Sequence, residues 1–105
     1  MKNALVLHLL EDLYVALGSG KGIMFYSIES ANVNIPIGVV RKIEHIKEGE
    51  TVIYLNPHCD GKVEDGKLTI RYEVLGDKNT SGEEIYPDGY EFSIPISIIK
   101  SSKRV

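Results

Sequence analysis

The sequence contains a single cysteine, Cys59, so no disulfide can form within the chain. One unpaired cysteine is typical of a reducing compartment, and we therefore expect a cytoplasmic protein. Zinc sites take about four ligands in closely spaced pairs, whereas His8, His45 and His58 are scattered, so we expect no zinc. The adjacent His58 and Cys59 do not make a nucleophile pair by adjacency alone, and we expect no enzyme activity.

Long apolar runs are also missing. Spanning a bilayer takes ~18 consecutive apolar residues, and no stretch of this sequence approaches that length. The apolar run at residues 4–10 is followed by Glu11 and Asp12, which does not fit a secretory signal, so we place residues 1–18 within the fold.

Positive charge is scarce. The chain has 12 Lys and Arg against 15 Asp and Glu, a net charge of −3. General binding to nucleic acid is therefore not expected, because neutralising phosphates requires a basic face. The length of 105 residues and the hydrophobic content of 43% indicate one globular domain, residues 1–105, that can form a core without disulfides.

Residues 4–17 predict an α-helix. They include only three polar residues, His8, Glu11 and Asp12, which fall on one side of a helix of period 3.6. A helix with so narrow a polar stripe needs cover on most of its surface, from loops or from a partner, as in a homodimer formed through this helix. An alternative ends the helix near Asp12 and makes residues 13–17 a strand that pairs with residues 23–28.

The rest of the chain predicts about five antiparallel strands, of which the last two alternate most clearly. Their approximate ranges are 23–30, 37–46, 51–56, 67–75 and 90–99. Residues 37–46 are also compatible with a helix, and residues 57–66 predict a turn region. We find no internal repeat. The expected fold is therefore α+β: an N-terminal apolar helix followed by a strongly bent, five-stranded antiparallel sheet or small open barrel.

The segment 77–88 follows the spacing of a calcium loop, with Gly82 at the position of the sharp turn. The candidate ligands are Asp77, Asn79, Ser81, Glu83 and Asp88. Three features depart from the EF-hand: Glu84 takes a position that is usually apolar, the last ligand is the short Asp88, and the flanks predict strands. We therefore expect an unliganded loop, with calcium as the alternative and no other cofactor.

The same region mixes acidic residues with tyrosines, a combination found at protein-recognition surfaces. The candidate contact residues are Glu83, Glu84, Tyr86, Asp88, Tyr90 and Glu91. Acids at these positions would steer a basic partner. The sequence thus predicts a non-catalytic protein-interaction module, such as an accessory, inhibitor or immunity-type protein.

Two alternatives remain. One is a small-ligand or calcium-binding module that uses residues 77–88. The other is a small nucleic-acid-binding barrel, which requires its basic residues to share one face. Those residues are Arg41, Lys42, Lys62, Lys67 and Arg71.

Overall fold

The structure is a computed structural model that describes residues 4–17, 24–28, 30–72 and 90–105. This part of the chain is nearly all β, with two short 3₁₀ helices and no α-helix. The strands are β1 (Leu5–Leu9), β2 (Tyr14–Leu17), β3 (Met24–Ile28), β4 (Val33–Pro36), β5 (Val40–Lys47), β6 (Glu50–Leu55), β7 (Cys59–Glu64), β8 (Lys67–Tyr72), β9 (Tyr90–Pro95) and β10 (Ile99–Arg104). The 3₁₀ helices are η1 (Ile37–Val39) and η2 (Ile96–Ile98). No helix in the described residues is long and apolar enough to cross a bilayer.

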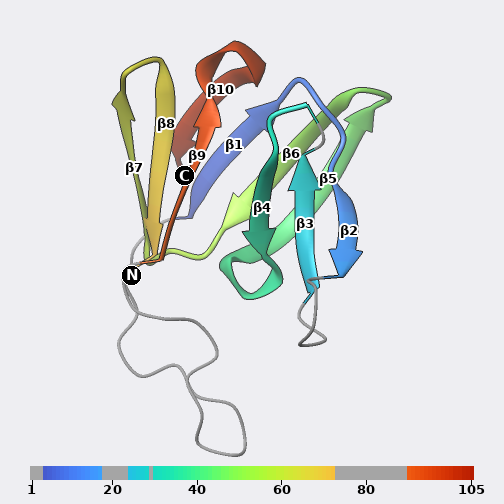
Figure 1. Ribbon diagram of the computed structural model, residues 1–105, viewed down its shortest axis with the longest axis horizontal. Coiled ribbons are helices and arrows are strands. Elements are labelled where there is room, and N and C mark those ends of the chain that lie inside the picture. The colour runs from blue at the N-terminus through green and yellow to red at the C-terminus, as the bar shows by residue number, and fades with distance from the viewer. Residues whose placement is uncertain (1–3, 18–23, 29, 73–89) are drawn as a thin grey trace, which may run out of the picture.

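The strands form three antiparallel sheets. Sheet A has the order β10-β1-β6-β5, sheet B the order β2-β3-β4, and sheet C the order β7-β8-β9. Sheets B and C occupy opposite sides of the view in Figure 1, and sheet A crosses behind them. Two tight hairpins use left-handed backbone, at Gly49 between β5 and β6, and at Asp65 and Gly66 between β7 and β8.

The predicted helix at residues 4–17 is wrong, and with it the α+β fold class. The segment forms β1 and β2, separated by a bend at Leu10 and Glu11. Because β1 is a central strand with apolar residues on both faces, its sequence is a near-continuous apolar run that periodicity alone does not distinguish from a buried helix. The alternative pairing was right about the second half, since β2 pairs with β3. The predicted homodimer relied on an apolar helix at residues 4–17, and this segment forms no helix.

The strands of the second half also differ from the expected ranges. The predicted strand at residues 37–46 is divided between η1 and β5, and β5 pairs with β6 as a hairpin. Residues 90–99 are likewise divided among β9, η2 and the start of β10. The predicted turn region at residues 57–66 contains β7, which alternates Cys59, Gly61 and Val63 with polar residues.

The two halves of the chain, β1–β5 and β6–β10, repeat one arrangement, whereas the sequence predicted no internal repeat. Each half contains an Ile-Pro-Ile step from a strand into a 3₁₀ helix, at Pro36 and at Pro95. The two prolines have nearly the same backbone angles, φ −57° and ψ 136° against φ −59° and ψ 136°. Each step is followed by an equivalent backbone hydrogen bond of 2.7 Å, from Asn56 to Val39 and from Leu10 to Ile98.

The two halves meet at Leu7 of β1 and Ile53 of β6, which are paired in the middle of sheet A. The order of sheet A is symmetric about this pair, because the last strand of each half pairs with the first strand of the other. The halves are therefore intertwined rather than side by side. Neither half can keep the pairing of its terminal strand without the other.

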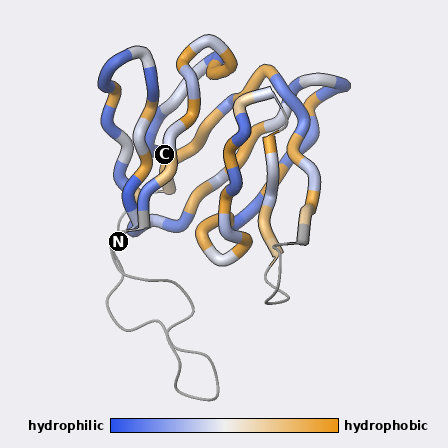
Figure 2. Tube along the Cα trace, in the orientation of Figure 1, coloured by the Kyte–Doolittle hydropathy of each residue, from blue (hydrophilic) through white to orange (hydrophobic). Residues whose placement is uncertain are grey.

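The core lies between the inner faces of the three sheets. Along most strands, hydrophobic and hydrophilic residues alternate (Figure 2). Fully buried side chains come from all three sheets and include Leu7, Leu9, Ile28, Ile35, Ile53, Leu55, Ile70, Tyr72 and Ile94. Gly61 lets β7 approach this core closely, because a Cβ at that position would lie 3.1 Å from Leu68 Cδ1 and 3.3 Å from Leu5 Cδ2.

Candidate functional site

Sheet A presents one face to the core and the other to the outside. Side chains alternate along a strand, so Leu7 and Ile53 point inward while their neighbours point outward. Glu50 at the start of β6 points outward. Beyond it, the outward residues of the two central strands are Val6, His8, Val52 and Tyr54. Three of these four are apolar or aromatic. The outer face of sheet A thus differs from an ordinary solvated sheet face, on which polar residues predominate.

These four side chains form the floor of a groove of about 380 Å³. Glu44 and Ile46 of β5 line one side, and Ser101, Lys103 and Val105 at the end of the chain line the other. Two of the apolar lining residues are strongly exposed: Ile46 at 54% and Val105 at 58%. The groove therefore combines an apolar floor with apolar side chains that remain open to solvent.

One end of this face is polar and is organised by Glu50, whose side chain is only 9% exposed. Glu50 Oε1 lies 2.8 Å from His8 Nε2 and 3.4 Å from Lys100 Nζ, and Glu50 Oε2 lies 2.7 Å from Lys47 Nζ. A buried carboxylate is stable only with such partners. The cluster joins β1, the β5–β6 hairpin and β10, and so holds the four strands under the groove together.

The edges of the groove carry lysines. Lys42 Nζ lies 2.7 Å from Glu44 and 5.3 Å from the centre of the Tyr54 ring, close enough for a cation–π contact. The hydrogen bond and the charge of Glu44 raise the pKa of Lys42 above its ordinary value, so this lysine stays protonated. Within the described residues, Lys103 on the opposite edge has no ion-pair partner.

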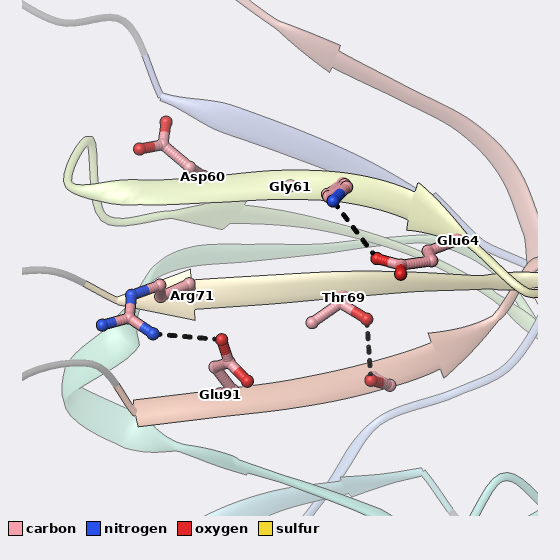
Figure 3. A pocket seen from close by; sticks show the side chains of 8 residues that line it. Asp60, Gly61, Glu64, Thr69, Arg71 and Glu91 are labelled. Carbon is pink, nitrogen blue, oxygen red and sulfur yellow. Dashed lines mark hydrogen bonds and ion pairs between the residues drawn. The ribbon is translucent and has the colours of Figure 1, made fainter.

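A second groove, of about 490 Å³, lies on the outer face of sheet C and is drawn in Figure 3. Its polar side chains bond to one another. Arg71 Nη1 lies 3.2 Å from Glu91 Oε1, and the hydroxyls of Thr69 and Ser93 are 3.1 Å apart across β8 and β9. Lys62 lies 3.4 Å from Glu64 on the same strand. These mutual contacts leave this groove with less bonding capacity for a ligand than its composition suggests.

A third cluster brings Asp12, His45 and Thr51 together, the residue types of a hydrolase triad. The Thr51 hydroxyl lies 3.5 Å from both Asp12 Oδ1 and His45 Nδ1, and His45 Nδ1 lies 4.0 Å from Asp12 Oδ1. An activated nucleophile needs contacts of about 2.6–3.2 Å and access to substrate, whereas Thr51 is fully buried. Asp12 instead accepts a hydrogen bond from the Gly49 amide and supports the β5–β6 hairpin.

The residues predicted from the sequence lie mostly elsewhere. The five calcium ligands, Asp77, Asn79, Ser81, Glu83 and Asp88, and the contact residues Glu84 and Tyr86 lie outside the described residues. Of the remaining contact residues, Tyr90 begins β9 opposite Tyr72. Glu91 lines the sheet C groove, where its carboxylate forms an ion pair with Arg71. The calcium loop and the acidic contact surface therefore remain predictions. Within the described ranges, no cluster of His, Cys, Asp and Glu could hold a metal.

Cys59 is not in a turn, as the sequence suggested, but is the first residue of β7 and is fully buried. Burial raises the pKa of its thiol to about 12, so the reactive thiolate is absent at neutral pH. The basic residues proposed for nucleic acid are divided: Arg41 and Lys42 lie on sheet A, and Lys62, Lys67 and Arg71 on sheet C. Lys42, Lys62 and Arg71 each pair with a carboxylate.

Sequence reasoning missed the groove on sheet A. The signal was present, because the apolar excess in residues 4–17 indicated a segment that needs cover on more than one side. It was assigned to a helix rather than to a central strand. No protein-family model, no curated protein and no solved structure matches this chain.

Proposed function

We propose that this protein is a protein-interaction module and that its docking face is the outer face of sheet A. One observation carries the proposal: the outer face of β1 and β6 carries Val6, Val52 and Tyr54, and of these Val52 and Tyr54 remain partly exposed. A sheet whose outer face meets only water usually alternates apolar and polar residues. Apolar patches rimmed by polar groups are characteristic of protein-binding surfaces.

The energetic reason lies in the exposed groove residues. Ile46 and Val105 are each more than half exposed, and Tyr54 is partly exposed. Complete burial of an aliphatic side chain is worth about 1.5–3 kcal/mol, so covering the remaining surface of Ile46 and Val105 gains about 1 kcal/mol each. Tyr54 offers a rigid ring with a polar tip, a residue type enriched at the centre of interfaces.

The edges of sheet A favour docking onto the face over addition of another strand. The outermost strands, β5 and β10, carry Lys42, Lys47, Lys100, Lys103 and Arg104. Charged side chains on edge strands, lysine above all, are a common protection against pairing with a foreign strand. The partner is therefore expected to cover the side chains of β1 and β6 rather than to extend the sheet.

A matched pair of variants tests the proposal. Val105→Asn removes an apolar contact from the groove, and Val63→Asn makes the same change on β7, where Val63 is 65% exposed and lies outside the groove. Tagged wild type and both variants are used to capture partners from the native cell. A partner that wild type and Val63→Asn retain and Val105→Asn loses supports the proposal. Partners lost with Val63→Asn but kept with Val105→Asn would place binding elsewhere.

A further inference from the structure

The outer face of sheet A is charged as well as apolar, and its charge is opposite to that of the whole chain. The chain has a net charge of −3. On and around the groove, within the part of the chain that the structure describes, four lysines stand against three glutamates: Lys42, Lys47, Lys100 and Lys103 against Glu44, Glu48 and Glu50. Lys47 and Lys100 both contact the Glu50 carboxylate, so a single negative charge faces two positive charges.

We infer that the segment that docks on this face is acidic as well as apolar. The inference rests on the proposed function and adds the chemical class of the partner. Complementary potentials across an interface select the partner and accelerate its association. The apolar floor requires apolar side chains, and the lysines on both edges require carboxylates beside them.

The positions of the lysines indicate how such a segment lies. Lys103 lines the groove on the β10 side and has no ion-pair partner in the described residues, so it is available to an incoming carboxylate. Lys42 lies on the β5 side, next to the Tyr54 ring. A segment that places its apolar side chains on Val6, Val52 and Tyr54 therefore has a lysine on each side.

The same charges disfavour a second copy of this chain as the occupant. Two such faces placed together would bring an excess of lysines against an excess of lysines, and like charges across an interface are repulsive. The sheet C groove of a second copy is lined by three carboxylates and two cations, but it has no large apolar side chain to place on the apolar floor of the sheet A groove. The favoured partner is a different protein with an acidic, apolar segment.

Two synthetic peptides test the charge. One alternates glutamate with leucine and the other alternates lysine with leucine. Each is titrated into the full chain while the backbone amides of β1 and β6 are followed by NMR. We expect the glutamate peptide to shift these amides and the lysine peptide to bind at least tenfold more weakly. Increasing salt should weaken binding of the glutamate peptide, since salt screens the attraction between exposed charges, over a distance of about 8 Å at physiological ionic strength.

A charge reversal supplies the matched control. Lys103→Glu in the groove should weaken the glutamate peptide by about three- to tenfold, because an exposed ion pair contributes up to about 1 kcal/mol and is replaced by repulsion. Lys67→Glu on β8 changes the net charge by the same amount and lies outside the groove. It should leave the affinity unchanged. Equal effects of the two variants would overturn the inference.

The outcomes separate this inference from the proposed function. Equal binding of both peptides at β1 and β6 overturns the acidic partner and supports docking at the face. Absence of shifts with either peptide also overturns the acidic partner, and the comparison of Val105→Asn with Val63→Asn then decides the docking face. A dimer in sedimentation that Val105→Asn dissociates would make a second copy the occupant and likewise overturn the inference.

Discussion

Val6 of β1 lies directly opposite Tyr54 of β6 on the outer face of sheet A. One residue further along the same two strands, Leu7 and Ile53 are also paired, but they face the core and are fully buried. Two adjacent pairs of side chains therefore have different surroundings, one in the core and one on the outer face. The inner pair stabilises the fold, whereas in the outer pair Val6 is buried and the Tyr54 ring remains partly exposed to a partner.

The inner and outer positions should respond differently to substitution. Leu7→Ala removes a fully buried side chain and should lower the free energy of unfolding by about 2–5 kcal/mol. Val52→Thr on the partly exposed outer face should cost less, about 1 kcal/mol. Urea unfolding followed by circular dichroism measures both. Similar losses for the two variants would mean that the outer face is covered within the monomer.

Gly61 should be intolerant of a side chain. Its missing Cβ would contact Leu68, Leu5 and Ile70 at 3.1–3.4 Å, and these residues are themselves buried in the core. Gly61→Ala should therefore destabilise the protein by about 1–3 kcal/mol through overpacking. Thermal unfolding compares this variant with Thr69→Ala on the outer face of the neighbouring strand. An unchanged or raised Tm for Gly61→Ala would show that β7 can move away from Leu5.

The buried thiol of Cys59 should make stability depend on alkaline pH. Its pKa rises from 9.0 to about 12 in the folded chain, because burial disfavours the thiolate. Between these two values the unfolded chain releases a proton that the folded chain retains. The stabilisation is thus complete below pH 9 and is lost progressively as the pH rises toward 12.

Comparison with Cys59→Ala isolates this effect from the titration of lysines and tyrosines. Above pH 9, wild type should lose up to about 1.4 kcal/mol per pH unit more than the variant. Urea unfolding at a series of pH values gives the difference. Parallel profiles for the two proteins would mean that the thiol ionises as readily in the folded chain as in the unfolded one.

Glu50 should matter far more than its neighbour in the hairpin. Glu50→Ala leaves His8, Lys47 and Lys100 without their shared carboxylate and should cost about 1.5–3 kcal/mol. Glu48 is exposed in the same hairpin, and Glu48→Ala should have little effect. Chemical unfolding of both variants at neutral pH makes the comparison. A small loss for Glu50→Ala would contradict its role in holding β1, β6 and β10 together.

The sequence allowed the antiparallel pairing to be predicted where one face of a strand is polar. In β8, Leu68, Ile70 and Tyr72 are buried and alternate with Lys67, Thr69 and Arg71, so the period of two is unambiguous. The same reasoning failed for β1, because Leu5, Val6 and Leu7 are all buried and no period remains. The ambiguity of β1 has the same cause as the groove: apolar residues on both faces.

The repeat of the two halves has a short counterpart in the sequence. Ile35-Pro36-Ile37 and Ile94-Pro95-Ile96 are the only Ile-Pro-Ile segments in the sequence, and both precede a strand that starts with one aliphatic residue followed by a basic one. The match is short, and the two halves share little else, so local patterns did not reveal it. The exchange of terminal strands between halves depends on contacts distant in sequence, which no local pattern encodes.

The most direct test of the docking face is a photo-crosslink made from within the groove. The substitution Tyr54→p-benzoylphenylalanine places the reactive ketone on the floor of the groove, and the same substitution at Val63 places it on sheet C. After illumination in the native cell, mass spectrometry identifies the crosslinked peptides. The account predicts one recurrent partner peptide, rich in acidic and apolar residues, from position 54 and not from position 63. A partner recovered from position 63 alone, or from neither position, would contradict it.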